Sequence, residues 1–286
     1  MLGLTGFHNN SNTCYVNVIL QILSHCELFV KESILLQDKY YNNALFSEWI
    51  ELQKTYWEKN RIITLNPILT HVYPIFEEHS QHDSHEFYLF FLDLIERNMQ
   101  TNYLMDKYFF GEFANIIDTI PIKNSGLVHE RSSSAEKFCI LSLDPKDSVD
   151  IAIKHWNMSE LINNWESNIY KKHRPAKKQI FFNKTPKYLS IHFKIFEYDR
   201  NSFKKISKHI NFEKNIDISA YCSKNTTNKT KYELFGVIVH QGSYQFGHYV
   251  AFILNNNKWF MYNDEIINES SFENVKSQSV YMLFYR

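Results

Sequence analysis

The sequence has few cysteines, no net charge and no long hydrophobic run. Its four cysteines form no C-x-x-C pair, which excludes the usual dithiol redox motif and zinc sites built from such pairs. The 31 basic and 31 acidic residues cancel, so no global field attracts nucleic acid or an anionic membrane. No run of about 18 apolar residues and no signal peptide is present. We expect an intracellular protein, cytoplasmic or nuclear, without nucleic-acid or membrane partners.

One basic cluster interrupts this balance. Lys171-Lys172-His173-Arg174 is followed by Lys177-Lys178, but no regularly spaced aromatic residues accompany them. This composition favours a solvated loop or helix face over a phosphate site. Hydrophobic residues make up 44% of the 286 residues and aromatics 16%, which is enough for a sizeable core in one domain, residues 1–286.

A cysteine near the start of the chain has the surroundings of a nucleophile. Cys14 follows small polar residues, and Asn12 and Thr13 are good N-cap residues. Cys14 should therefore lie in the first turn of a helix, where free N–H groups and the helix dipole lower the pKa of a thiol. The apolar residues that follow have the spacing of a helix packed by one face: Val16, Ile19, Leu20 and Leu23. Taken alone, a free cysteine is more commonly a small buried hydrophobe.

A histidine near the other end of the chain is the candidate base. His248 stands between Gly247 and Tyr249, and a thiol with a distant histidine is what cysteine nucleophilic catalysis needs. The loop from His240 to Gly247 should lie close to the occupant of the cleft, because glycine permits close approach and positive φ. Gly247 and Tyr249 are therefore candidate substrate-binding residues.

The residues after His248 predict a β-hairpin. Residues 249–254 and 258–262 should pair across a turn at 255–257, which returns His248 and the pair Asn263-Asp264 to nearly the same level. One of these two side chains would then fix the histidine tautomer. Neighbours on an extended chain point to opposite faces. Asn263 is the first choice for this role and Asp264 the second.

The residues around Cys14 resemble the cysteine box of the ubiquitin-specific proteases, a family of deubiquitinating cysteine proteases. The matching positions are Gly6, Phe7, Asn9, Asn12, Thr13, Cys14, Tyr15, Asn17, Leu20 and Gln21. The resemblance implies that Asn9 donates a hydrogen bond to the oxyanion, with the Cys14 backbone N–H as a second donor. An asparagine in a turn is the alternative. Asn10 and Ser11 stand where the family has leucine and glycine.

A second block, from Gln81 to Phe87, resembles the family's Gln-Gln-Asp-x-x-Glu-Phe motif. Asp83 and Glu86 form an Asp-x-x-Glu capping arrangement before an apolar helix. The resemblance implies that they also help to hold the arginine-rich tail of ubiquitin. Histidines at 79, 82 and 85 raise the alternative of a metal site, but on a regular helix all three cannot face one ion, and no H-E-x-x-H pattern occurs. We expect no metal and no cofactor.

A third block, Tyr188 to Phe196, resembles the family's Leu-x-Ile-His-Leu-Lys-Arg-Phe strand, and its alternation predicts a half-buried strand with His192 and Lys194 on the polar face. The resemblance implies an α+β fold of the papain-like cysteine protease type. Its parts would be a helical thumb (1–105), reduced fingers (106–187) and an antiparallel-sheet palm (188–286). Many members hold zinc in the fingers with two C-x-x-C pairs. Without these pairs we expect the region to be shortened or held by packing alone, and we expect no appended domain.

These motifs together imply a thiol-dependent deubiquitinase that hydrolyses the amide or isopeptide bond after the C-terminal glycine of ubiquitin. Its partners would be ubiquitin or ubiquitinated proteins, and it would act as a monomer. Two alternatives remain. The departures at Asn10 and Ser11 and the missing zinc ligands would suit a catalytically weak ubiquitin-binding module, and the same hydrolysis could act on a ubiquitin-like modifier.

Overall fold

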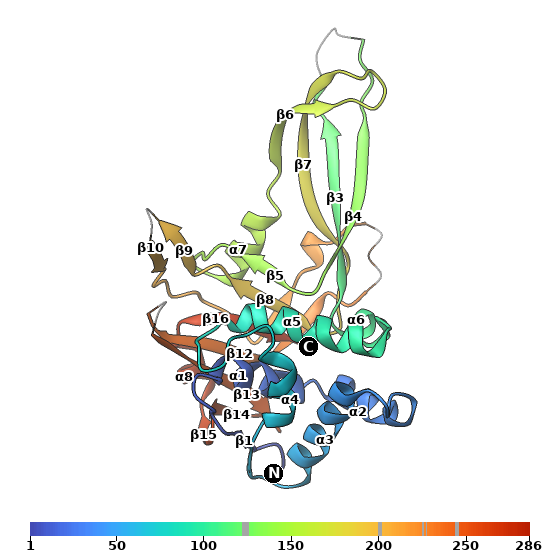
Figure 1. Ribbon diagram of the computed structural model, residues 1–286. Coiled ribbons are helices and arrows are strands. Elements are labelled where there is room, and N and C mark those ends of the chain that lie inside the picture. The colour runs from blue at the N-terminus through green and yellow to red at the C-terminus, as the bar shows by residue number, and fades with distance from the viewer. Residues whose placement is uncertain (122–125, 200–201, 225, 227, 244–245) are drawn as a thin grey trace.

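The computed structural model consists of a helical layer, a large central sheet and a second sheet that projects away from both (Figure 1). The helical layer comes mainly from the first 108 residues, and the central sheet mainly from the last hundred. The structure describes residues 1–121, 126–199, 202–224, 226, 228–243 and 246–286.

The central sheet carries His248 and Asn263, the candidate base and the first candidate for orienting it, on neighbouring strands. Its strands, in sheet order, are β15 (Ile266–Ser270), β14 (Lys258–Asn263), β13 (Gly247–Asn255), β12 (Lys231–Gly242), β16 (Val280–Tyr285), β8 (Leu189–Phe193) and β5 (Leu141–Leu143), with β11 (Asn215–Asp217) also paired to β12. The pairs are antiparallel except β5 with β8. The predicted hairpin is confirmed as β13 and β14. Its turn is Asn256-Asn257, both with positive φ, whereas Asn255 belongs to the strand.

The helices cover this sheet and each other. They are α1 (Cys14–Ser24), α2 (Glu27–Leu35), α3 (Ala44–Glu58), α4 (Asn66–Val72), α5 (Ser84–Met99), α6 (Tyr103–Tyr108), α7 (Val149–Trp156) and α8 (Phe272–Lys276), with 3₁₀ turns η1 (Gln37–Lys39) and η2 (Ser219–Tyr221). Helix α1 packs on β13, β14 and α5. Gly236 of β12 also faces this helix, because a Cβ there would lie 2.5 Å from the Cδ1 atom of Ile22 and would displace that side chain.

Helix α1 is more deeply buried than its sequence pattern indicates. All eleven of its residues are buried, including Asn17 and Gln21. The prediction of a helix packed by one face is therefore wrong, because the sheet covers one side and the other helices cover the rest. Burial of each large aliphatic side chain contributes about 1.5–3 kcal/mol, so α1 is a main contributor to the core.

Strand β8 also differs from its prediction. All five of its residues are buried, so it is not half-buried, and His192 does not lie on a solvated face. The Tyr88 hydroxyl and the Ser190 hydroxyl share a hydrogen bond, and the His85 ring stacks on His192 with centroids 3.9 Å apart. Both residues 85 and 88 belong to α5, which therefore covers the face of β8 that the alternating pattern assigned to water.

The projecting sheet contains, in sheet order, β4 (Arg131–Phe138), β3 (Gly111–Thr119), β7 (His173–Lys184) and β6 (Glu160–Glu166) (Figure 1). Its far end is held by a buried ion pair, in which Arg174 donates to Glu130 at 2.8 Å. The buried hydroxyl of Ser167 donates to the same carboxylate at 2.5 Å. This ion pair and hydrogen bond hold the region in addition to packing, which the sequence did not predict. Arg174, expected in a solvated basic run, is only 3% exposed.

Two short sheets complete the fold. Strand β1 (Gly6–Phe7) pairs in parallel with β2 (Ile62–Ile63), just before the loop that carries Cys14. Strands β9 (Phe196–Asp199) and β10 (Ser202–Lys205) form a separate hairpin beside the central sheet (Figure 1). Within the described ranges, no helix has the length and apolar character required to cross a membrane.

Candidate active site

Cys14 is the first residue of α1, as predicted, and is 5% exposed. The preceding loop is tightly turned, since Ser11 and Asn12 both have positive φ (60° and 67°). Thr13 is the N-cap, although its side chain makes no capping hydrogen bond to the helix. Its backbone N–H donates instead to the Asn9 Oδ1 atom at 3.0 Å. The loop therefore fixes the Asn9 amide next to the start of the helix.

His248 lies between the Cys14 thiol and the Asn263 amide. The Asn263 Oδ1 atom is 2.6 Å from His248 Nε2. Nε2 is therefore the protonated donor, which leaves Nδ1 for the thiol. The pKa of His248 is raised to about 9, first by its hydrogen bond with Cys14 and then by the Asn263 bond, against the opposing effect of burial. An imidazole with this pKa is protonated at neutral pH.

Asp264 binds the Asn9 side of the site rather than the imidazole. Its carboxylate accepts a hydrogen bond from Asn9 Nδ2 and another from Asn17 Nδ2, both at 2.7 Å. The Asp264 Oδ2 atom lies 3.7 Å from His248 Nε2. Asp264 has φ of 52° and lies outside β14, so the assumption of an extended chain through this pair is wrong. Both side chains therefore reach the site, each with a different partner.

A cavity of about 440 Å³ opens beside the thiol. It is lined by Cys14, Ser80, Gln81, His82, Asp83, Glu86, Phe196, His240, Gly247 and Tyr249. A Cβ at Gly247 would lie 1.9 Å from the His240 Nε2 atom, so a side chain at 247 would require the buried His240 ring to move. All four sequence-predicted substrate-binding residues, Asp83, Glu86, Gly247 and Tyr249, therefore border one cavity with the thiol.

The two carboxylates of this cavity have different surroundings. Asp83 caps α5 by accepting from the His85 N–H at 2.7 Å, as the sequence predicts, and the Tyr281 hydroxyl donates to both of its oxygens at 2.5 and 2.7 Å. Glu86 is an exposed residue, but its carboxyl is partly shielded from water, and this desolvation, followed by the charge of Asp83, raises its pKa. Glu86 is therefore the carboxylate more available to a cationic ligand.

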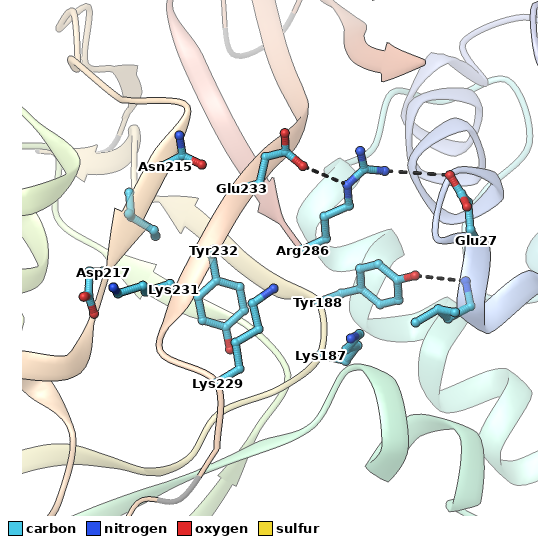
Figure 2. Close-up of a pocket in the computed structure, with 12 residues that line it drawn as sticks. Glu27, Lys187, Tyr188, Asn215, Asp217, Lys229, Lys231, Tyr232, Glu233 and Arg286 are labelled. Atoms are coloured by element: carbon cyan, nitrogen blue, oxygen red, sulfur yellow. Dashed lines mark hydrogen bonds and ion pairs between the residues drawn. The ribbon is translucent and has the colours of Figure 1, made fainter. Parts of the chain in front are cut away.

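A larger cavity, about 790 Å³, lies elsewhere and contains none of the predicted site residues. Figure 2 shows Arg286 extended between Glu233 and Glu27, with Tyr188 and Tyr232 on the wall nearby. The Arg286 guanidinium lies 3.4 Å from the Glu233 carboxylate and 3.9 Å from that of Glu27. This cavity has no cysteine among its lining residues, and it is not a candidate for thiol chemistry.

The three histidines of the alternative metal site have separate partners. His82 Nε2 is 2.9 Å from the Glu77 carbonyl oxygen, and His79 Nε2 is 3.7 Å from Glu78. The His85 ring stacks on His192. In the part of the chain that the structure describes, no three histidine, cysteine, aspartate or glutamate side chains are grouped so as to hold a metal ion.

A thiol and an imidazole oriented by an amide, where a buried helix meets an antiparallel sheet, define a cysteine hydrolase with a papain-like α+β fold. The family model for ubiquitin carboxyl-terminal hydrolase matches residues 5–285. The chain therefore belongs to this family of cysteine-type deubiquitinating enzymes, the one that its motifs resemble.

Individual relatives agree with this assignment. Ubiquitin carboxyl-terminal hydrolase 23 of Arabidopsis thaliana is 28% identical over 98% of this chain, which spans 35% of that protein. Ubiquitin carboxyl-terminal hydrolase 8 of Saccharomyces cerevisiae is 26% identical, with 99% of this chain and 70% of the relative covered. The structure of the SAGA Ubp8/Sgf11/Sus1/Sgf73 DUB module bound to ubiquitin aldehyde matches with a TM-score of 0.86 and 26% identity, over 99% of this chain and 69% of that one.

Sequence reasoning assigned no role to Asn17, Gln81 or Lys205. Asn17 offered a signal, because it is a polar residue within the apolar pattern of α1, and buried polar groups need partners. Gln81 lies in the second block, yet nothing local indicates that its side chain reaches Gly247. Lys205 belongs to none of the motifs, and its contacts with the carbonyl oxygens of His240 and Gly242 depend on the fold.

Proposed function

We propose that this chain is an active deubiquitinase, with Cys14 as nucleophile and His248 as acid and base. The Cys14 thiolate attacks the carbonyl carbon of the C-terminal glycine of ubiquitin. The C–N bond then breaks, His248 gives its proton to the departing amine, and a thioester remains. Water, deprotonated by His248, hydrolyses the thioester and regenerates the thiol. The contact of His248 with both Cys14 and Asn263 is the observation that carries this proposal.

In this mechanism Asn263 orients the imidazole, and Asn9 stabilises the oxyanion. Asn9 Nδ2 carries two hydrogens. One is bound to Asp264, and the other remains for the developing charge, with the Cys14 backbone N–H as second donor. Asp264 acts through Asn9 and is therefore a positioning residue. Loss of one side-chain oxyanion donor typically lowers kcat by about 100- to 1000-fold.

The cavity suits a cationic and slender substrate tail. We assign the cation contact first to Glu86, because Asp83 already accepts hydrogen bonds from Tyr281 and from its own helix. Gly247 and Tyr249 border the end of the cavity near Cys14, where His240 leaves no space for a side chain at 247. Selectivity for a Gly-Gly terminus would then be largely steric.

Labelling with ubiquitin that carries a C-terminal electrophile tests the proposal. We expect one adduct on the wild-type chain and on Cys222→Ala, and none on Cys14→Ala. Cys222→Ala is the control because it removes a different thiol by the same substitution. Burial raises the pKa of the thiols of Cys222, Cys26 and Cys139, the last to about 11, so none of the three should react with the probe. An adduct that persists in Cys14→Ala would falsify the assignment.

Turnover separates the remaining alternatives. Release of a fluorescent group from the C-terminus of ubiquitin is expected from the wild-type chain, whereas binding without turnover identifies a ubiquitin-binding module. Competition between probes built on ubiquitin and on ubiquitin-like modifiers identifies the preferred modifier. The monomeric state and the cytoplasmic or nuclear location stay predictions. The Ubp8 structures contain further subunits, so the mass of the free protein in solution should be measured directly.

A further inference from the structure

The side chain of Gln81 closes the catalytic cavity with two hydrogen bonds to one residue of the opposite wall. Gln81 Nε2 donates to the Gly247 carbonyl oxygen at 3.1 Å, and the Gly247 N–H donates to Gln81 Oε1 at 3.0 Å. Gln81 precedes α5, whereas Gly247 opens β13. The pair therefore joins the helical layer to the sheet across a cavity that Cys14 also lines.

The backbone N–H and C=O of Gly247 have no partner on β14, because β13 extends beyond that strand. The pairing of β13 with β14 begins at Ala251, opposite Tyr262. On the other side Gly247 lies opposite Gly242 of β12. Its N–H and C=O are bound to Gln81, so they point away from β12 and toward the cavity. A strand edge of this kind is a template for an added extended chain.

The Gln81 carboxamide makes the same hydrogen bonds as one backbone residue of an added strand would make. In an antiparallel sheet, two opposed residues of a hydrogen-bonded pair exchange both N–H···O bonds. Gln81 makes the same two bonds with Gly247 through its side chain. We propose that Gln81 holds the place of the substrate backbone, and that the extended ubiquitin tail displaces it by pairing with Gly247. This inference rests on the proposed function.

The edge itself is held independently of Gln81. The Lys205 ammonium on β10 donates to the carbonyl oxygens of His240 and Gly242, at 2.7 and 2.9 Å. His240 in turn lies against Gly247. Release of Gln81 should therefore free the backbone groups of Gly247 without moving the strand that presents them. Gln81 then acts as a competitor of the substrate and raises KM.

Removal of the competitor should strengthen substrate binding. Two exposed neutral hydrogen bonds are lost in Gln81→Ala, so we expect KM for ubiquitin with a fluorescent leaving group to fall about three- to tenfold, with kcat little changed. Gln278→Ala is the matched control, because the Gln278 side chain also makes two hydrogen bonds to one residue, Asn274, and Gln278 does not line the catalytic cavity. It should leave both constants unchanged. A rise of KM in Gln81→Ala would show that Gln81 contacts the substrate, and would overturn the inference.

A second measurement does not depend on turnover. The chain contains seven glycines, so selective ¹⁵N-glycine labelling gives few amide signals, including that of Gly247. In Cys14→Ala, the Gly247 N–H should be protected from exchange by Gln81, and the added substitution Gln81→Ala should remove this protection. Ubiquitin should restore it in the double variant. If ubiquitin leaves the Gly247 signal unaltered in both Cys14→Ala and the double variant, the displacement model is wrong. Absence of turnover in the wild-type chain would count against the proposed function alone.

Discussion

Asp264 should affect catalysis through Asn9, the proposed oxyanion donor, and not through substrate binding. Asp264→Ala removes the hydrogen bonds from Asn9 Nδ2 and Asn17 Nδ2, both 2.7 Å long in the folded protein. The Asn9 Oδ1 atom stays bound to the Thr13 N–H at 3.0 Å, so the amide keeps part of its orientation. A fully lost donor lowers kcat by about 100- to 1000-fold. With one anchor left, we expect a fall in kcat of about 10- to 100-fold.

Steady-state kinetics with a fluorogenic ubiquitin substrate measures this effect. KM should be unchanged, because the oxyanion exists only along the reaction and not in the bound ground state. Asn17→Ala is the matched control, since it removes one bond to Asp264 and leaves the bond to Asn9 in place. Thermal melting of both variants monitors folding. A kcat of Asp264→Ala within about twofold of wild type, or an equal loss in Asn17→Ala, contradicts the role given to Asp264.

The raised pKa of His248, about 9, predicts that kcat/KM has its alkaline limb near pH 9, where the imidazolium loses the proton that it gives to the leaving amine. The same shift stabilises the fold fully below the unfolded pKa of about 6.5 and is lost as pH rises through about 9. Asn263→Ala should move the limb to lower pH, and a limb near 7 in the wild-type profile would count against the thiol–imidazole contact. At the far end of the projecting sheet, Glu130→Ala leaves the buried Arg174 without its carboxylate partner. The variant should therefore melt at a lower temperature, and proteolysis at this end of the sheet should be faster. Its kcat on a small fluorogenic substrate should be unchanged. Equal protease resistance of variant and wild type would contradict this.

Much of the site was readable from the sequence because each of its parts has a local signature. Cys14 follows good N-cap residues, and His248 begins a strand whose hairpin turn is rich in asparagine, so the helix start and the return of Asn263 to His248 both follow from short-range rules. The motif around Asp83 likewise predicts its capping role, which is confirmed by the hydrogen bond from the His85 N–H.

The remaining features depend on contacts between distant segments. The alternation of β8 indicates one solvated face, but α5 covers that face, and no pattern within nine residues can report a helix that lies a hundred positions earlier. The partner of Arg174 is Glu130, forty-four positions away across the projecting sheet. The division of labour between Asn263 and Asp264 depends on the positive φ of Asp264, which the sequence pattern did not indicate.

Because α1 is completely buried, the Cys14 thiol should be less mobile than the His248 imidazole. A helix enclosed on every side cannot shift without disrupting the whole core, so the sulfur of Cys14 is anchored to the most protected element of the molecule. His248 is the second residue of β13, and its side chain is 36% exposed. Any adjustment of the catalytic pair during a reaction cycle must therefore come from the imidazole. Deuterium uptake should accordingly be orders of magnitude slower along α1 than at the first residues of β13.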